Sequence, residues 1–149
     1  MTDIAFYHLE RSSLDIALPK LLEKTREAEK RALVLARTEA QVEALADLLW
    51  SYDADAWLPH GSIKDGFADQ QPIWLSIVDE NANKATFMFM TNGATSAHVG
   101  NYERCFVLFD GNDPVAVSDA RGRWKTYLAD GHDLAYWQQT ESGGWAKKG

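Results

Sequence analysis

Short apolar runs and segments of helical periodicity take turns along the first fifty residues. Residues 3–9 and 32–36 are apolar runs typical of buried strands. Each is followed by a segment whose apolar side chains recur every three or four residues, as on one side of a helix. Asp15 and Thr38 are the expected N-caps of these two helices. The order strand, helix, strand, helix predicts βαβ units and a parallel sheet.

Residues 51–72 are rich in turn-forming residues and predict an irregular segment with a brief strand at Trp57 and Leu58. Strand patterns return at 73–77, 86–90 and 104–109, and the polar residues 79–84 predict a turn between the first two.

A clear helix signal follows the last of these strands. Asp113 is a capping residue directly before Pro114, and Gly131 is a typical helix stop, which together predict a helix over 114–130. The tail over 132–149 carries too many aromatic residues for a disordered end, and we expect it to pack against the body of the protein.

The chain is expected to form one α/β domain over residues 1–149. A phosphate-binding loop would need glycines between the first strand and the first helix, because its backbone N–H groups must approach the phosphates closely. Residues 10–14 contain no glycine, and no G-x-G-x-x-G or G-x-x-x-x-G-K-[ST] motif occurs in the sequence. We therefore expect no nucleotide cofactor, and no other cofactor is indicated.

The charge of the chain is acidic overall but uneven. The net charge is −7 and the isoelectric point about 5.0, so the overall field opposes binding to phosphate backbones. Residues 1–117 carry ten basic and eighteen acidic residues, whereas residues 118–149 carry five and four. Little or no direct nucleic-acid binding is expected. A local cationic site for a small anionic partner and a simple solvated helix face are both compatible with this charge pattern.

Cellular location follows from features that the sequence lacks. The only cysteine, Cys105, cannot form an internal disulfide, and no apolar segment approaches the length of a membrane span. The first residues do not form a basic, apolar leader. A cytoplasmic protein without membrane contact is therefore expected.

Candidate catalytic groups are few. Cys105 lies within a strand pattern and is expected to be a buried core residue, and no metal-binding motif is present. Asp110 follows a strand directly, and His60 and His98 lie in predicted loops. An alternative function is therefore a small-molecule-binding α/β protein or an enzyme that uses Asp110, His60 and His98, although turn formation is the favoured role for Asp110. No enzyme is indicated.

The helix over 114–130 has two distinct sides. Ala116, Ala120 and Tyr127 form a stripe suited to close contact with a sheet, and Arg123 borders this stripe and is expected to reach past it to water. The other side combines apolar and cationic residues, namely Val117, Arg121, Trp124, Lys125 and Leu128. Such a mixture suits a ligand with an apolar group beside a carboxylate. The alternative is that Trp124 packs under the tail while the two cations extend into water.

Several short motifs resemble one known family. They are Phe6-Tyr7, Trp57-Leu58-Pro59-His60, the segment from Arg121 to Tyr127 before Gly131, and the aromatic tail with Tyr136, Trp137 and Trp145. In this order they are similar to the chi subunit of DNA polymerase III. The resemblance implies a Rossmann-like three-layer fold that lacks the phosphate-binding loop, and it implies no catalysis. It also implies two partners: the psi subunit, and the acidic C-terminal tail of single-stranded DNA-binding protein, which ends in a phenylalanine carboxylate.

The resemblance assigns roles to a small set of residues. The tail-binding positions of the family fall on Arg121, Trp124 and Lys125, with Leu128 one turn further and Val117 where another cation can stand in the family. For psi, the resemblance indicates Trp57 and Leu58. Trp50 is a further candidate beside Trp57, although its helical position favours the core.

Overall fold

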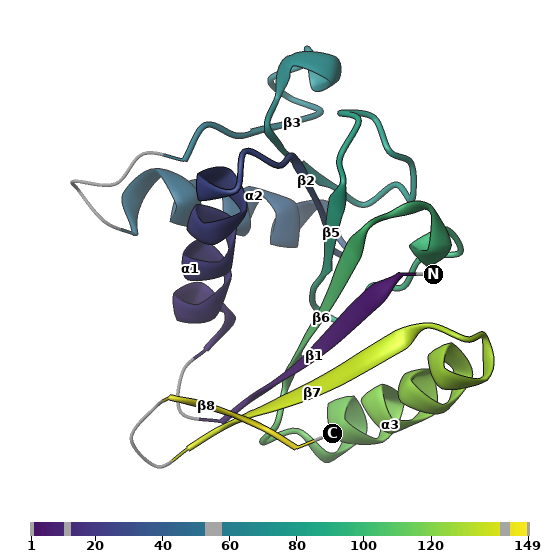
Figure 1. Ribbon diagram of the computed structural model, residues 1–149. Helices are drawn as coiled ribbons and strands as arrows, with labels where there is room; N and C mark the ends of the chain where they lie inside the picture. The colour runs from purple at the N-terminus through teal and green to yellow at the C-terminus, as the bar shows by residue number, and fades with distance from the viewer. Residues whose placement is uncertain (1, 11–12, 53–57, 141–143, 149) are drawn as a thin grey trace.

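A computed structural model describes residues 2–10, 13–52, 58–140 and 144–148 (Figure 1). In this part of the chain, one eight-stranded sheet is flanked by three α-helices. The elements in chain order are β1 (Asp3–Leu9), α1 (Leu14–Glu27), β2 (Ala32–Leu35), α2 (Glu39–Ser51), β3 (Gly61–Ser62), the 3-10 turn η1 (Ala68–Gln70), β4 (Ile73–Ser76), β5 (Phe87–Met90), the 3-10 turn η2 (Val99–Asn101), β6 (Arg104–Asp110), α3 (Pro114–Ala129), β7 (Asp133–Gln139) and β8 (Trp145–Lys147). The predicted α/β class is confirmed. None of the described helices is both long and apolar enough to span a bilayer.

The sheet is parallel except at one edge. Its strand order is β3-β4-β2-β5-β6-β1-β7-β8, and β8 runs antiparallel to β7. The predicted mainly parallel sheet is confirmed. Residues 79–84 do form a turn-containing connection between β4 and β5, as predicted. Because β2 lies between these two parallel strands, the connection crosses from one side of β2 to the other. In a dinucleotide-binding sheet the first strand lies beside the second, whereas here β5 and β6 separate β1 from β2.

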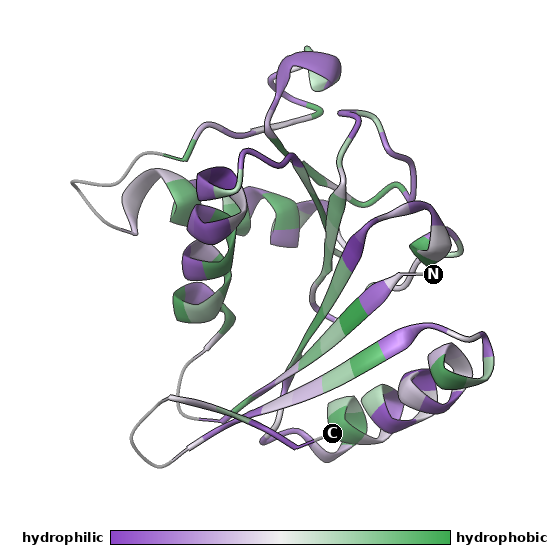
Figure 2. Cartoon of the chain, in the orientation of Figure 1, coloured by the Kyte–Doolittle hydropathy of each residue, from purple (hydrophilic) through white to green (hydrophobic). Residues whose placement is uncertain are grey.

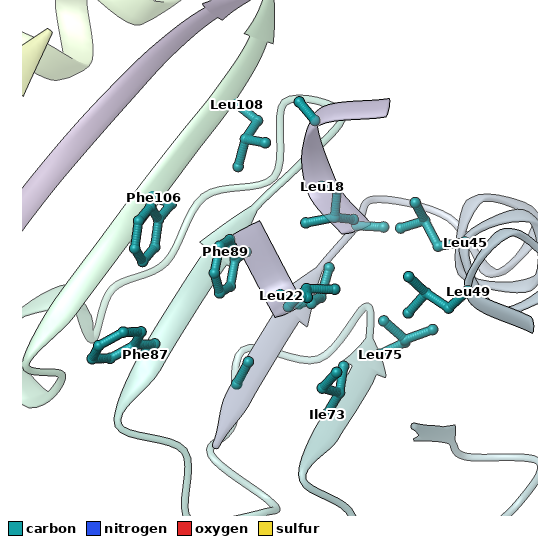
Figure 3. Close-up of a cluster of buried hydrophobic side chains, with 14 of the residues drawn as sticks. Leu18, Leu22, Leu45, Leu49, Ile73, Leu75, Phe87, Phe89, Phe106 and Leu108 are labelled. Carbon is teal, nitrogen blue, oxygen red and sulfur yellow. The ribbon is translucent and has the colours of Figure 1, made fainter. Parts of the chain in front are cut away.

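One face of the sheet is covered by α1 and α2 (Figure 1). Leucines of both helices meet the aromatic residues of the central strands there, as Figure 3 shows for Leu18 and Leu22. The rings of Phe89 and Phe106 stack with their centroids 4.3 Å apart. Burying one such side chain contributes about 1.5–3 kcal/mol, so this apolar layer is a large source of stability.

On the opposite face, α3 covers β1, β6 and β7. The loops before and after β5 contribute the buried residues Ala85, Ala94, Val99 and Tyr102 to the same face. The predicted stripe of α3 does face the sheet, because Ala120 and Tyr127 are buried and Ala116 packs against the same cluster. Figure 2 shows hydrophobic central strands and a mixed, largely hydrophilic α3. A single helix therefore covers β1, β6 and β7 on this face.

Two of the three predicted helix N-caps are confirmed, and one is wrong. Thr38 and Gln41 form a reciprocal capping box at α2, and the Asp113 carboxylate accepts a hydrogen bond from the Val115 N–H, 3.0 Å away, at α3. The cap expected at Asp15 is wrong. The N-cap is Ser13, so α1 begins two residues earlier than predicted, and Asp15 lies in its first turn, where its negative charge interacts favourably with the positive end of the helix dipole.

The strand predictions failed at two places. β7 and β8 were not predicted as strands, although the tail does pack on the body as expected. The brief strand expected at Trp57 and Leu58 is found instead at Gly61–Ser62. Leu58 is not in a strand, and Trp57 lies outside the described residues.

Candidate functional site

The α3 surface consists of Val117, Arg121, Trp124, Lys125 and Leu128. Trp124 is half-buried, with its ring edge-on to Phe6 of β1 at 5.3 Å and to Tyr136 of β7 at 5.9 Å between centroids. Val117 is also half-buried against this cluster, whereas Leu128 is 58% exposed. The predicted apolar floor is thus made of Val117 and Trp124, and Leu128 stands at its rim.

Two cations flank this floor. Arg121 and Lys125 are exposed and separated by one helical turn. Within the described part of the chain, neither forms an ion pair within 4.0 Å. Both charges are therefore available to an anionic group placed over Trp124.

A hydrogen-bonded network from β1 and β7 lies beside Trp124. His8 Nδ1 is 2.6 Å from the Tyr136 hydroxyl, and a Glu10 carboxylate oxygen accepts a hydrogen bond from Gln138 at 3.0 Å. His8 Nε2 lies 2.9 Å from the same oxygen but has no hydrogen-bond partner among the described residues. A glycine is required at position 111 beside this network, because a β-carbon there would collide with the His8 ring. Burial raises the pKa of Tyr136, and the positive charge of Arg121 acts against this rise. The Arg121 guanidinium therefore lies within electrostatic reach of the Tyr136 hydroxyl.

Sequence reasoning did not include Tyr136 in this site. The residue was recognised only as part of an aromatic tail. The signal available was its place in a short apolar segment directly after the Gly131 helix stop. That segment becomes part of the site because β7 pairs with β1.

A second exposed apolar area flanks the β3 edge of the sheet. Trp50 is 63% exposed at the end of α2, so the core position favoured by its sequence context is wrong; its ring lies 4.5 Å from that of His60. Leu58 is buried. Ile63 and Phe67, which the sequence analysis did not select, are 73% and 72% exposed. We call Trp50, Ile63 and Phe67 the β3-edge surface.

The three residues of the alternative small-molecule site do not line one cavity. Asp110 lines a cleft of about 1160 Å³ at the carboxyl edge of the sheet, between α3 and the starts of α1 and α2. It accepts a hydrogen bond from the Asn112 N–H at 2.9 Å, the turn role favoured above. His60 is buried with both ring nitrogens near backbone carbonyls, at 2.7 and 3.1 Å, and His98 lies beside Asp79 at 3.9 Å. Neither histidine is among the described residues that line the cleft.

Arg123 also lines this cleft, and its side chain does not take the predicted path to water. Its Nη2 donates to the Met90 sulfur at 3.1 Å, and its Nε is buried without an acceptor among the described residues. The side chain is therefore turned toward β5 and does not simply extend past the stripe to water.

Cys105 is fully buried on β6, as expected for a core cysteine. Burial raises the pKa of its thiol to about 12, so the nucleophilic thiolate is disfavoured. Among the residues that the structure describes, no group of three or more His, Cys, Asp or Glu side chains is placed to hold a metal ion.

The structure is that of an α/β protein with a mainly parallel sheet and with a cationic and aromatic side on α3. Comparison with known proteins shows the family. The family model described as DNA polymerase III chi subunit, HolC, matches residues 1–135, and the chain belongs to this family. A curated relative, the probable DNA polymerase III subunit chi of Rickettsia prowazekii (strain Madrid E), is 26% identical over 99 residues, which make up 66% of this chain. The match spans 60% of that relative's length.

Proposed function

We propose that this protein is a non-catalytic accessory subunit of the bacterial DNA polymerase III holoenzyme. In this role it bridges the clamp loader, which it joins through psi, and the acidic C-terminal tail of single-stranded DNA-binding protein in the cytoplasm. The proposed tail binding is supported by the α3 surface. There, two cations flank the half-buried Trp124, and neither has an ion-pair partner among the described residues. Membership of the chi family supports the assignment to the replicase.

The chemistry of the α3 surface matches the end of such a tail. The guanidinium of Arg121 can hold a carboxylate through two parallel hydrogen bonds, and Lys125 adds a second positive charge one turn away. The exposed part of Trp124 and the side chain of Leu128 offer an apolar contact for a terminal phenyl ring. The rest of the chain is acidic and repels the same tail, so binding is directed to this one surface.

Peptide titration tests this assignment. A fluorescent peptide ending in Asp-Ile-Pro-Phe is titrated with the wild type, Arg121→Ala and the control Arg37→Ala, and fluorescence anisotropy gives Kd. Arg37 is a suitable control because it is also exposed but lines the cleft near α2. Hydrogen bonds to charged groups contribute about 1.5–3 kcal/mol, so Arg121→Ala should weaken binding roughly tenfold or more. Binding should also weaken as salt is raised. Equal affinity of Arg121→Ala and the wild type would refute the site.

We infer that psi binds over the β3-edge surface together with Trp57. Exposed large aromatic and aliphatic side chains are typical anchors of protein interfaces, and Trp50, Ile63 and Phe67 meet this description. Leu58 is buried and would support the surface from beneath.

Affinity capture tests the psi surface. Tagged wild type and a Trp50→Ala/Phe67→Ala variant are used to capture partners from native lysate, and co-purifying clamp-loader subunits are quantified. The double variant should lose clamp-loader subunits and retain single-stranded DNA-binding protein. Equal recovery of the clamp loader by both proteins would place psi elsewhere.

Direct DNA binding is expected to be weak, because the net charge is −7. A gel-shift experiment with single-stranded DNA at low salt should show no complex at concentrations where the peptide binds. A tight protein–DNA complex would require a different role.

A further inference from the structure

The C-terminal strand places a lysine beside the α3 surface. The Lys148 N–H donates to the Tyr136 carbonyl oxygen at 2.7 Å, which extends the antiparallel pairing of β7 and β8 by one residue. Tyr136 and Lys148 are therefore directly opposite each other across the two strands. Side chains of such a pair project to the same face of the sheet.

That face is the one covered by α3. The Tyr136 ring contacts Trp124 of α3 and stacks on Phe6 at 6.4 Å between centroids. The preceding lysine points the other way, because Lys147 pairs with Trp137, which packs against Tyr7 on the face covered by α1. Two consecutive exposed lysines therefore lie on opposite faces of the same strand.

Charges of both signs surround Tyr136, because Arg121 lowers the pKa of its hydroxyl and Glu10 raises it. Arg121 acts on the Tyr136 hydroxyl from α3, and Lys148 flanks Tyr136 from β8. The nearby carboxylate of Glu10 accepts a hydrogen bond from the Gln138 side chain. Within the described residues Lys148 forms no ion pair. On α3 itself, position 117 is a half-buried valine and supplies no charge.

We propose that Lys148 is a further cation of the tail-binding site, positioned by β8 to bind the acidic residues that precede the terminal phenylalanine. This inference rests on the proposed binding of an acidic tail by the α3 surface. The tail then lies across α3 toward β7 and β8, with its terminal carboxylate at Arg121 and Lys125 and its upstream acidic residues at Lys148. The residues matched by the family model end at 135, so the family match does not assign this role.

Two peptides and two lysine variants test the proposal. One fluorescent peptide ends in Asp-Asp-Asp-Ile-Pro-Phe and the other in Asn-Asn-Asn-Ile-Pro-Phe, and each is titrated with wild type, Lys148→Ala and Lys147→Ala at low salt. Lys147→Ala is a matched control, because it removes the same charge from the adjacent residue on the opposite face. Lys148→Ala should weaken binding of the acidic peptide roughly three- to fivefold, the range of an exposed ion pair. It should leave the affinity for the asparagine peptide within twofold of the wild-type value, and Lys147→Ala should leave the affinity for both peptides unchanged.

The possible outcomes separate the two proposals. If the wild type binds neither peptide, the tail-binding function is wrong and this inference is lost with it. If the wild type binds and Lys148→Ala matches the wild type on the acidic peptide, tail binding stands and the role of Lys148 is refuted. Equal losses in Lys148→Ala and Lys147→Ala would show an effect of net charge and would also refute it. A selective loss in Lys148→Ala on the acidic peptide supports the proposal.

Discussion

The two faces of the sheet differ in how completely helices cover them. On the face of α1 and α2, leucines of two helices close over Phe89 and Phe106, and the partly buried Tyr7, Trp137 and Trp145 lie at the edge of this layer. On the other face, α3 covers the strands alone, and Trp124, Tyr136 and Val117 are only half-buried beside a polar network. The helix pair of the first face contributes mainly to stability, whereas the single helix of the second face also presents exposed cations beside partly buried aromatic groups. Stability and recognition can therefore be tested separately.

Removing a core leucine should have the largest effect on stability. Leu22→Ala removes a fully buried side chain of α1 and should lower the free energy of unfolding by about 2–5 kcal/mol, because it leaves a cavity. Leu128→Ala is the matched control, since this leucine is 58% exposed on α3 and should change stability by less than about 0.5 kcal/mol. Urea unfolding measures both. Similar losses in the two variants would contradict the division between the faces.

Trp124 lies at the boundary between core and surface, so its removal should reduce both stability and binding. Trp124→Ala should lower the free energy of unfolding by about 2 kcal/mol, through lost ring contacts with Phe6 and Tyr136. It should also weaken tail-peptide binding at temperatures where the variant stays folded. Trp50→Ala, on the exposed β3-edge surface, should leave the peptide affinity unchanged. Anisotropy titrations together with urea unfolding give the two readouts, and a Trp124→Ala variant with wild-type affinity would remove Trp124 from the site.

The buried thiol of Cys105 should make stability fall at alkaline pH. In the folded state its pKa is raised from 9.0 to about 12 by burial. Between these pH values the unfolded state has lost the thiol proton while the folded state keeps it, so the free energy of unfolding decreases as pH rises. The slope is about 1.4 kcal/mol per pH unit for one group. Urea unfolding at pH 8 and pH 10.5 should therefore show a smaller decrease for Cys105→Ala than for the wild type. Identical decreases would mean that the thiol ionises normally in the folded protein.

Helix capping should give the smallest effect. Asp113→Ala removes the carboxylate that accepts from the Val115 N–H and should cost about 1 kcal/mol. Ser13→Ala at the start of α1 should cost less, because the Ser13 side chain makes no capping hydrogen bond. Thermal unfolding of the two variants compares them. A larger loss in Ser13→Ala would show that the start of α1 is held by an interaction of the serine hydroxyl.

Local signals in the sequence were sufficient for several elements. The N-cap at Thr38 and the Asp113-Pro114 start of α3 depend on neighbouring residues only, and both were predicted correctly. The stripe of Ala120 and Tyr127 followed from helical periodicity alone. Trp50 failed for the opposite reason: its spacing on α2 fits a core position, but the described residues leave its side chain 63% exposed at the end of that helix.

The sequence by itself determined an acidic α/β chain with a mainly parallel sheet, without a phosphate-binding loop, and with a cationic and aromatic side on its last helix. Only the tertiary structure decided that β7 pairs with β1, that β8 completes the edge, and that Tyr136 contacts Trp124 with Lys148 opposite it across the two strands. The physical reason is the range of the interactions. Caps and helix faces arise between residues a few positions apart, whereas a strand such as β7 is defined by partners more than a hundred residues away.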